Sequence, residues 1–174
     1  MMDRVYYFEL EEGKIMRKFI LIAIVLLLTV LAACSSEKDD IKSGKKSHNP
    51  KSGDTWEQTT SKEELPGFLD ESDENMHTLY LAVAQHQDLL QQIPCYCGCG
   101  ESADHTSNYD CFTHDNSQKA VTWDNHAITC QACLDIAAKS ISKSIDGIPV
   151  QDIRKDIDQE YKEDYADPTP TPEV

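Results

Sequence analysis

The chain has 174 residues and a formal net charge of −15 at pH 7, because 31 acidic residues outnumber 16 lysines and arginines. So acidic a surface argues against binding to nucleic acid and against docking on anionic lipid headgroups, since both would repel it. Length and composition allow one small domain of about 100 residues, which gains a useful share of its stability from cross-links or bound metal.

A secretory leader is the first predicted element. Residues 16–33 read MRKFILIAIVLLLTVLAA, in which two basic residues precede an apolar run of 12 residues at 19–30. Such a run is too short for a comfortable membrane span and is typical of a signal peptide. Residues 1–15 are acidic instead of basic, so we expect the true start to be Met16.

The leader ends in a candidate lipidation site. Residues 31–34 read LAAC and resemble a bacterial lipobox. The resemblance implies that Cys34 is diacylated, becomes the mature N-terminus and holds the protein on the extracytoplasmic face of the cell membrane. Two acyl chains on one residue make a durable anchor, whereas a single chain binds only marginally.

Two polar segments flank the predicted domain. Residues 34–54 are polar and rich in lysine, so they predict a flexible, lipid-anchored tether. Residues 167–174 read DPTPTPEV and predict a disordered tail, because prolines interrupt the segment. Residues 55–166 then form a single cysteine- and histidine-bearing domain.

We expect this domain to be mainly α, with about three helices and a long cysteine-rich loop. Apolar residues recur at three- and four-residue steps over residues 73–92 and 125–145. A third helix begins at Pro149, which suits a first helical turn. Residues 121–123 predict a short extended piece, and no run shows the sustained alternation of a half-buried strand.

Metal-binding residue types are concentrated in one segment. Six cysteines and three histidines lie between residues 95 and 133. The candidate ligands are Cys95, Cys97, Cys99, His105, Cys111, His126, Cys130 and Cys133. We interpret His114 as an ordinary surface or core residue, as we do His77 and His86 on the first predicted helix.

The second predicted helix carries three of these ligands. His126, Cys130 and Cys133 have the spacing i, i+4 and i+7, which predicts that they share one face of the helix. Asp124 is the candidate cap at the start of this helix. The spacing therefore predicts a stripe of sulfur and imidazole along one helix.

The motif PCYCGCG, residues 94–100, puts three cysteines at alternate positions. In an extended chain Cys95 and Cys99 would stand about 13 Å apart. Thiolates around one tetrahedral ion lie within about 4 Å of each other. Gly98 and Gly100 permit a turn, because glycine accepts positive φ. We therefore expect the triplet to turn and to bring two or three sulfurs against the second helix.

Three interpretations of the cysteines remain open. Thiolates with imidazoles suit copper(I) or zinc, and the histidines favour this metal-binding interpretation. Alternatively, Cys97 with Cys99, or Cys130 with Cys133, forms a redox pair that acts on secreted proteins. The third interpretation is a disulfide-stapled interaction module, because six is an even number and the predicted location is oxidising. No serine or carboxylate active site is evident, so the sequence does not favour an enzyme.

The sequence resembles the PCYCGC-motif lipoproteins of Gram-positive bacteria. The resemblance is carried by IPCYCGC at 93–99, WDNH at 123–126, CQAC at 130–133 and IDQEY at 157–161. It extends over most of the predicted domain. It implies a lipid-anchored extracytoplasmic domain whose cysteines bind metal, and it supplies no substrate, reaction or protein partner.

Overall fold

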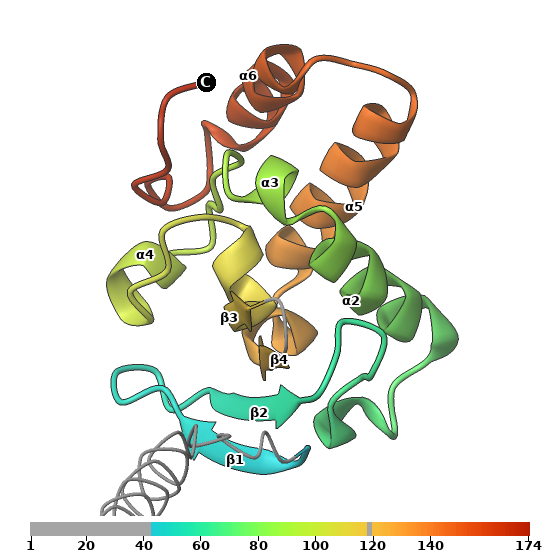
Figure 1. The fold of residues 1–174 in the computed structure, drawn as a ribbon. Coiled ribbons are helices and arrows are strands. Elements are labelled where there is room, and N and C mark those ends of the chain that lie inside the picture. The colour runs from blue at the N-terminus through green and yellow to red at the C-terminus, as the bar shows by residue number, and fades with distance from the viewer. Residues whose placement is uncertain (1–42, 118–119) are drawn as a thin grey trace, which may run out of the picture. The chain divides into compact units, whose positions relative to one another are not determined.

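The computed structural model describes residues 43–117 and 120–174. In this part the chain forms a four-stranded antiparallel sheet and five α-helices (Figure 1). The prediction of a mainly α domain of about three helices is therefore wrong, and the fold is mixed α and β. Part of the predicted tether is also folded, because strand β1 (Lys45–His48) lies within residues 34–54.

The sheet has the strand order β1-β2-β4-β3, and all neighbouring strands are antiparallel. Strand β2 spans Thr55–Thr59, β3 spans Thr113–Ser117 and β4 spans Ala120–Asp124. The extended piece expected at residues 121–123 is thus the centre of β4. This strand is buried along most of its length, which places its end inside the domain.

Polar residues on the inner face of β2 explain why the sequence did not predict a sheet. Glu57 and Thr59 are buried there, whereas Trp56, which directly precedes Glu57, is only partly buried. The Glu57 carboxylate pairs with the Lys46 ammonium at 3.2 Å. The Thr59 hydroxyl accepts a hydrogen bond from the Trp123 indole at 2.8 Å. Because these buried polar groups have partners, the strand folds without the apolar alternation that marks strands in a sequence.

The helices partly match the predicted ones but have different boundaries. In chain order they are α2 (Glu74–Gln85), α3 (Gln87–Leu90), α4 (Cys99–Ser102), α5 (Gln131–Ile145) and α6 (Val150–Tyr161). Short 3₁₀ turns cover Gly67–Leu69, Tyr109–Cys111 and His126–Thr129. Helix α5 contacts α2, α3 and α6, so it is the central helix of the domain (Figure 1).

The first predicted helix, residues 73–92, is divided in two. Asp73 caps α2, since its carboxylate accepts the backbone N–H of Met76 at 2.9 Å. His86 leaves the helical conformation, with φ −111° and ψ 33°, and its ring nitrogen Nδ1 lies 2.7 Å from the carbonyl oxygen of Ala82. The side chain thus bonds to a carbonyl of the preceding turn where the helix ends.

The second predicted helix, residues 125–145, begins only at Gln131. Asp124 does not cap it, because its Oδ1 accepts the backbone N–H of His126 at 2.8 Å and supports a 3₁₀ turn. Cys130 is then extended, with φ −121° and ψ 96°, and serves as the cap of α5. His126 and Cys130 therefore do not share a helical face with Cys133, and the predicted stripe is wrong.

Aromatic packing joins the sheet to the helices. Tyr80 on α2 packs edge-on against Phe112, with ring centroids 5.0 Å apart, and lies 6.0 Å from Trp123 on β4. All three side chains are fully buried. The Tyr80 hydroxyl also donates a hydrogen bond to the backbone carbonyl of Asp124 at 2.9 Å. These contacts fix the end of β4, from which the chain continues into His126 and α5.

Residues 166–172, which we call the C-terminal strap, pack against the PCYCGC motif. The N–H of Ala166 donates to the carbonyl of Tyr96 at 3.0 Å. Thr169 and Cys95 exchange two hydrogen bonds of 2.9 Å: the Thr169 N–H donates to the Cys95 carbonyl, and the Cys95 N–H donates to the Thr169 hydroxyl. Thr169 is buried, so the prediction of a disordered tail over residues 167–174 is wrong for this segment. The motif backbone needs hydrogen-bond partners, and the strap supplies them.

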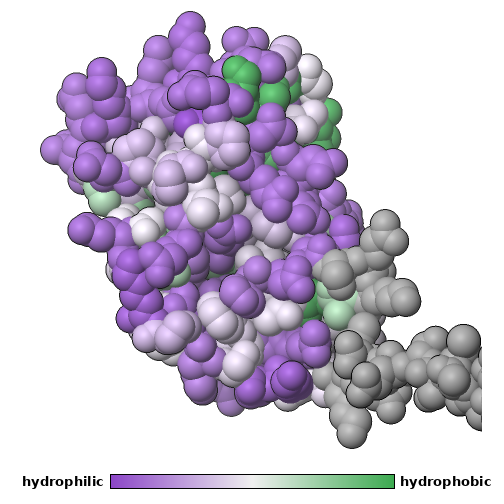
Figure 2. Space-filling model, turned by 60° about the vertical axis from the view of Figure 1, so that its left-hand side comes forward, coloured by the Kyte–Doolittle hydropathy of each residue, from purple (hydrophilic) through white to green (hydrophobic). Residues whose placement is uncertain are grey.

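One face of the described part is largely polar. Figure 2 shows this face, on which hydrophobic residues lie in small separate areas. The large exposed hydrophobic residues of the described part are Ile145, Ile148, Tyr165 and Val174. Among the described helices, none combines the length and the apolar character needed to cross a membrane.

The strap predicts a specific effect of removing one hydroxyl group. Thr169→Val leaves the buried N–H of Cys95 without its acceptor, so we expect it to lower the free energy of unfolding by about 1–3 kcal/mol. Urea denaturation of the reduced, metal-free protein measures this change. Thr78→Val is the matched control, because the Thr78 hydroxyl is exposed on α2. Equal effects of the two substitutions would contradict the role given to the strap.

Candidate metal centre

Tyr96 anchors the first half of the PCYCGC motif to α6. Its hydroxyl donates to the Asp158 carboxylate at 2.7 Å, and its ring stacks on that of Tyr161 with centroids 6.0 Å apart. The C-terminal strap holds the backbone of Cys95 through its two hydrogen bonds with Thr169. The side chain of Cys95 is consequently buried inside the domain.

Gly98 turns the chain between the second and third cysteines of the motif. Its φ of 87° lies in the left-handed region, which glycine adopts without the strain that a Cβ would cause. Gly98 precedes the short helix α4, whose first residue is Cys99. The triplet therefore turns as the sequence predicted, and its three sulfurs lie within 4.8 Å of one another and of the Cys111 sulfur.

Asn108 connects the loop that follows the motif to α5. Its backbone N–H donates to the carbonyl of Ile93 at 2.8 Å, and its side-chain amide donates to the carbonyl of Cys133 at 3.1 Å. Asn108 is fully buried. The adjacent 3₁₀ turn contains Cys111, which is thereby placed beside the motif.

The sulfur atoms of the motif meet those of the rest of the chain. The Sγ atom of Cys133 lies 3.4 Å from that of Cys95 and 3.5 Å from that of Cys97. The Sγ atoms of Cys99 and Cys111 are 3.6 Å apart. Ligands bound at 2.3 Å to one tetrahedral ion stand about 3.8 Å from each other. The spacing of these sulfurs therefore suits coordination of a metal ion.

Cys130 and Cys133 form a close pair at the start of α5. The Cys130 sulfur accepts the backbone N–H of Cys133 at 3.4 Å, and the two sulfurs are 2.8 Å apart. Cys130 is half-buried, whereas Cys133 is buried. Only Cys133 belongs to the helix itself, and the cap position brings Cys130 beside it without any helical periodicity.

His126 lies between a thiol and a carboxylate. Its Nε2 is 3.6 Å from the Sγ of Cys97, and its Nδ1 is 2.9 Å from the Oδ2 of Asp54. A carboxylate on the far nitrogen is the usual arrangement for a metal-ligating histidine, because it fixes the orientation and the tautomer of the ring. The 3₁₀ turn that begins at His126 thus leaves Nε2 directed toward the cysteines.

His105 is the second histidine of the cluster. It is only 5% exposed, and its ring centroid is 4.8 Å from that of His126. Its Nε2 is 3.6 Å from the Oδ2 of Asp124, while its buried Nδ1 has no hydrogen-bond partner in the described part of the chain. Asp124 is itself buried and accepts a hydrogen bond from the Trp56 indole at 2.6 Å. The unpartnered Nδ1 is therefore one of the candidate ligand atoms of the cluster.

The two carboxylates beside the histidines are not among the predicted ligands. The sequence predicts Asp124 as a helix cap, although its position two residues before His126 is a usable signal. Asp54 lies at the end of the predicted tether, 72 residues from the histidine that it contacts. No local pattern could have connected those two residues, because β2 brings them together through the sheet.

Candidate ligand atoms form four overlapping groups in the described residues. Within each group, all ligand atoms lie within 4.8 Å of one another. The groups are Cys95, Cys97, Cys99 and Cys111; Cys97, His126, Cys130 and Cys133; Cys99, His105, Cys111 and His126; and Asp54, His105 and Asp124. All eight ligands predicted from the sequence thus occur in one continuous cluster.

The remaining histidines that the sequence analysis set aside lie outside these groups. His114 stacks on Trp56, with centroids 3.6 Å apart. The Nε2 of His77 is 2.7 Å from the carbonyl oxygen of Leu69, and His86 contacts the backbone of α2. Each of the three therefore has a structural contact of its own.

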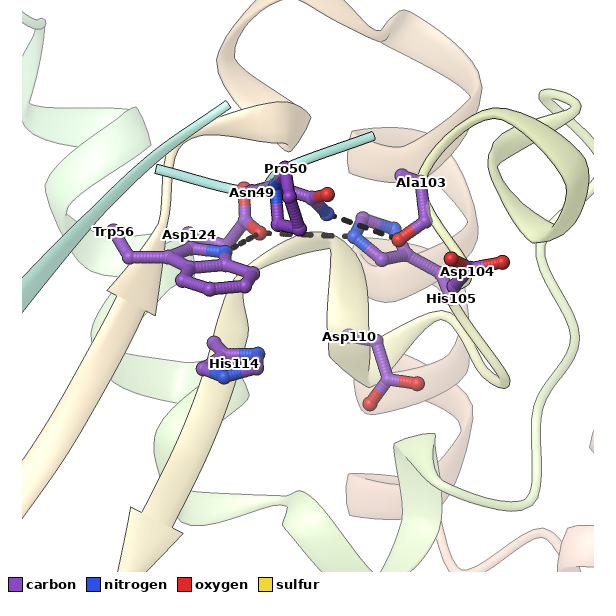
Figure 3. A pocket seen from close by; sticks show the side chains of 9 residues that line it. All are labelled: Asn49, Pro50, Trp56, Ala103, Asp104, His105, Asp110, His114 and Asp124. Atoms are coloured by element: carbon purple, nitrogen blue, oxygen red, sulfur yellow. Dashed lines mark hydrogen bonds and ion pairs between the residues drawn. The ribbon is translucent and has the colours of Figure 1, made fainter. Parts of the chain in front are cut away.

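A cavity of about 280 Å³ lies beside the cluster. Figure 3 shows Trp56 and His114 stacked on one side of it, and His105 facing Asp124 on another. Two further carboxylates, those of Asp104 and Asp110, line the cavity. His105 therefore borders both this acidic cavity and the cysteine cluster.

Hydrogen bonding gives the thiols unlike protonation states in the metal-free cluster. Hydrogen bonds from neighbouring thiols, that of Cys111 foremost, lower the pKa of Cys97 far below its ordinary value. The same kind of contact, again with Cys111 foremost, lowers the pKa of Cys95 to about 4. Burial raises the pKa of Cys111 itself. Protonated thiols thus donate to thiolates, as expected where several thiols share one buried site.

The histidine and its carboxylate carry opposite charges. Burial alone would lower the pKa of His126, but hydrogen bonds with two thiols and with Asp54 outweigh it and raise that pKa to about 11. Burial alone would raise the pKa of Asp54, but hydrogen bonds from Ser52 and His126 lower it. A metal ion would therefore replace the imidazolium proton that faces the thiolates.

Comparison with known proteins assigns the family. The sequence profile of a family described as "protein of unknown function with PCYCGC motif" matches residues 22–174. The chain belongs to this PCYCGC family. Neither the curated proteins nor the solved structures contain a significant match. The six-cysteine arrangement described above is therefore the structural context of the PCYCGC motif in this chain.

The lowered pKa of Cys97 predicts selective alkylation. A thiol with a lowered pKa is a thiolate at pH values where an ordinary cysteine is protonated, and the thiolate is the reactive form. In the reduced, metal-free protein at about pH 6, we expect iodoacetamide to modify Cys97 at least about tenfold faster than the single cysteine of an unstructured reference peptide. Peptide mass spectrometry measures both rates in the same reaction mixture. Equal rates of alkylation at this pH would contradict the lowered pKa of Cys97.

Proposed function

We propose that the chain is an extracytoplasmic lipoprotein that binds copper(I) or zinc through its Cys/His cluster, for storage, delivery or structure. The observation that carries the metal part is the convergence of six thiols and two imidazoles from separate segments into one cluster. Soft thiolate ligands with imidazole select such thiophilic ions. A disulfide framework would not need the two histidines or their carboxylate partners.

The outer contacts of the histidines support the proposal. Asp54 bonds to the nitrogen of His126 that points away from the cysteines, and Asp124 lies beside His105. Such carboxylates orient metal-ligating imidazoles and raise their basicity. The residues around the cluster therefore form the surroundings that a bound ion requires, in addition to its direct ligands.

The membrane part of the proposal rests on the sequence. The leader at residues 16–33 and Cys34 lie outside the described residues. The proposed anchor is a diacylated Cys34 on the outer face of the cell membrane, followed by a short tether into β1.

A redox function is the second candidate, and one observation favours it. Cys130 and Cys133 form a CxxC pair at the N-terminal end of a 15-residue helix, with sulfurs 2.8 Å apart. A helix N-terminus stabilises a thiolate, as in disulfide oxidoreductases. However, Cys133 also contacts two cysteines of the motif, which an isolated exchange pair would not require.

Elemental analysis tests the metal function directly. We expect the full chain, purified in mild detergent without air, to contain at least about one equivalent of copper or zinc per chain.

A substitution tests the role of His126 in the same site. His126→Ala should weaken zinc binding at least about tenfold, because it removes a ligand that Asp54 holds in place. His48→Ala is the matched control, since His48 is exposed on β1.

Two results would contradict the proposal and select another function. Absence of metal together with one readily reversible disulfide would select thiol–disulfide exchange. Absence of metal together with three stable disulfides would select the interaction module. Mass measurement before and after reduction and alkylation distinguishes these results, because each disulfide changes the number of alkylated thiols.

The lipid anchor has its own test. We expect Cys34→Ser to release the protein from the membrane fraction, because the residue that would carry the lipid is lost. Cell fractionation and mass spectrometry of the N-terminal peptide check this prediction. Ser35→Ala is the control. Membrane retention of the Cys34 variant at the level of the control would show that another segment anchors the chain.

A further inference from the structure

The number of ligands in the cluster exceeds what one ion can use. A tetrahedral thiophilic ion takes four ligands, whereas six sulfurs and two imidazoles are gathered here. Two of the four-ligand groups together contain seven of these eight residues, and they have a single residue in common, Cys97. This overlap determines how two ions would share the cluster.

The shared residue is a cysteine, whose thiolate sulfur is chemically able to bridge two ions. After binding one ion, a thiolate sulfur still has lone pairs for a second ion. A neutral imidazole nitrogen has one lone pair and binds one ion only. The Nε2 of His126 faces Cys97 and its Nδ1 contacts Asp54, so His126 serves a single ion.

The third group is not an independent site. Its members Cys99 and Cys111 already belong to the group of four sulfurs, and His126 already belongs to the group with Cys130. Only His105 is new in it. When both four-ligand groups are filled, His105 lies beside the cluster without binding either ion.

We infer that the cluster holds two thiophilic metal ions bridged by the Cys97 sulfur, one retained and one exchangeable; this rests on the proposed metal-binding function. The inner ion is bound by sulfur alone, from Cys95, Cys97, Cys99 and Cys111. The outer ion is bound by three sulfurs and one nitrogen, from Cys97, His126, Cys130 and Cys133.

The ligands of the two ions differ in their exposure to solvent. Cys95, Cys99 and Cys111 are each 0% exposed, so apart from Cys97 the ligands of the inner ion are closed to solvent. In the outer group His126 and Cys130 are half-buried, as is the shared Cys97. A chelator or an acceptor thiol therefore reaches the outer ion first. The inner ion is the structural one, since it ties the PCYCGC motif to the 3₁₀ turn that carries Cys111.

Cadmium-113 nuclear magnetic resonance tests the bridge without any substitution. The probe is ¹¹³Cd²⁺, added without air to the metal-free full chain in detergent. We expect two equivalents and two resonances, the outer one shifted toward higher shielding by its nitrogen ligand. Scalar coupling between the two resonances is expected through the Cys97 sulfur. Two resonances without coupling would overturn the assignment of Cys97 as a ligand of both ions.

Chelator competition tests the inequality of the ions. We expect one cadmium ion to transfer to EDTA at least about tenfold faster than the other, because fewer of its ligands are buried. Cys130→Ser should abolish the fast phase and keep the all-sulfur resonance. Cys99→Ser should abolish the slow phase. A single phase of two equivalents in the wild type would overturn the inference.

The outcomes separate this inference from the proposed function. Binding of one equivalent with one resonance leaves the metal function intact and overturns the two-ion cluster. Failure to bind any cadmium overturns both. Two coupled resonances with two rates of release support both, and they do not depend on whether a variant folds.

Discussion

Asn108 makes the contact on which the cluster depends. The PCYCGC motif and α5 are separated by about 30 residues of chain, and their sulfurs lie within contact distance only if both backbones are held in register. The buried Asn108 does this by donating to Ile93 before the motif and to Cys133 on the helix. A buried amide with these two partners is far more costly to displace than an exposed hydrogen bond. Together with the strap and the hydrogen bond between Tyr96 and Asp158, this link positions the motif beside α5.

The sequence predicted the composition of the cluster better than its architecture. Alternate cysteines interrupted by Gly98 required a turn, because an extended triplet cannot serve one ion, and the turn is present. The site also contains each of the eight selected cysteines and histidines in close proximity. The turn and the proximity of these residues were predictable because both depend on ligand geometry, which holds whatever fold surrounds it.

The architecture was less predictable, for reasons that particular residues make clear. Glu57 and Thr59 point into the core with partners of their own, so β2 lacks the apolar alternation of a strand. Cys130 leaves the helix that its spacing predicted, because Asp124 uses its carboxylate to support the preceding 3₁₀ turn. Asp54 reaches the site only through the sheet. In each case a tertiary contact outweighed a local preference.

The C-terminal strap also bears on when the cluster takes its final form. The strap is synthesised after every cysteine of the domain, yet it pairs with the backbone of Cys95 and Tyr96. During synthesis the motif therefore spends an interval without these hydrogen-bond partners. In that interval nothing in the strap holds the backbone of Cys95 and Tyr96, and this part of the motif can take other conformations. The final arrangement of the motif backbone is therefore completed only when the strap has joined the fold.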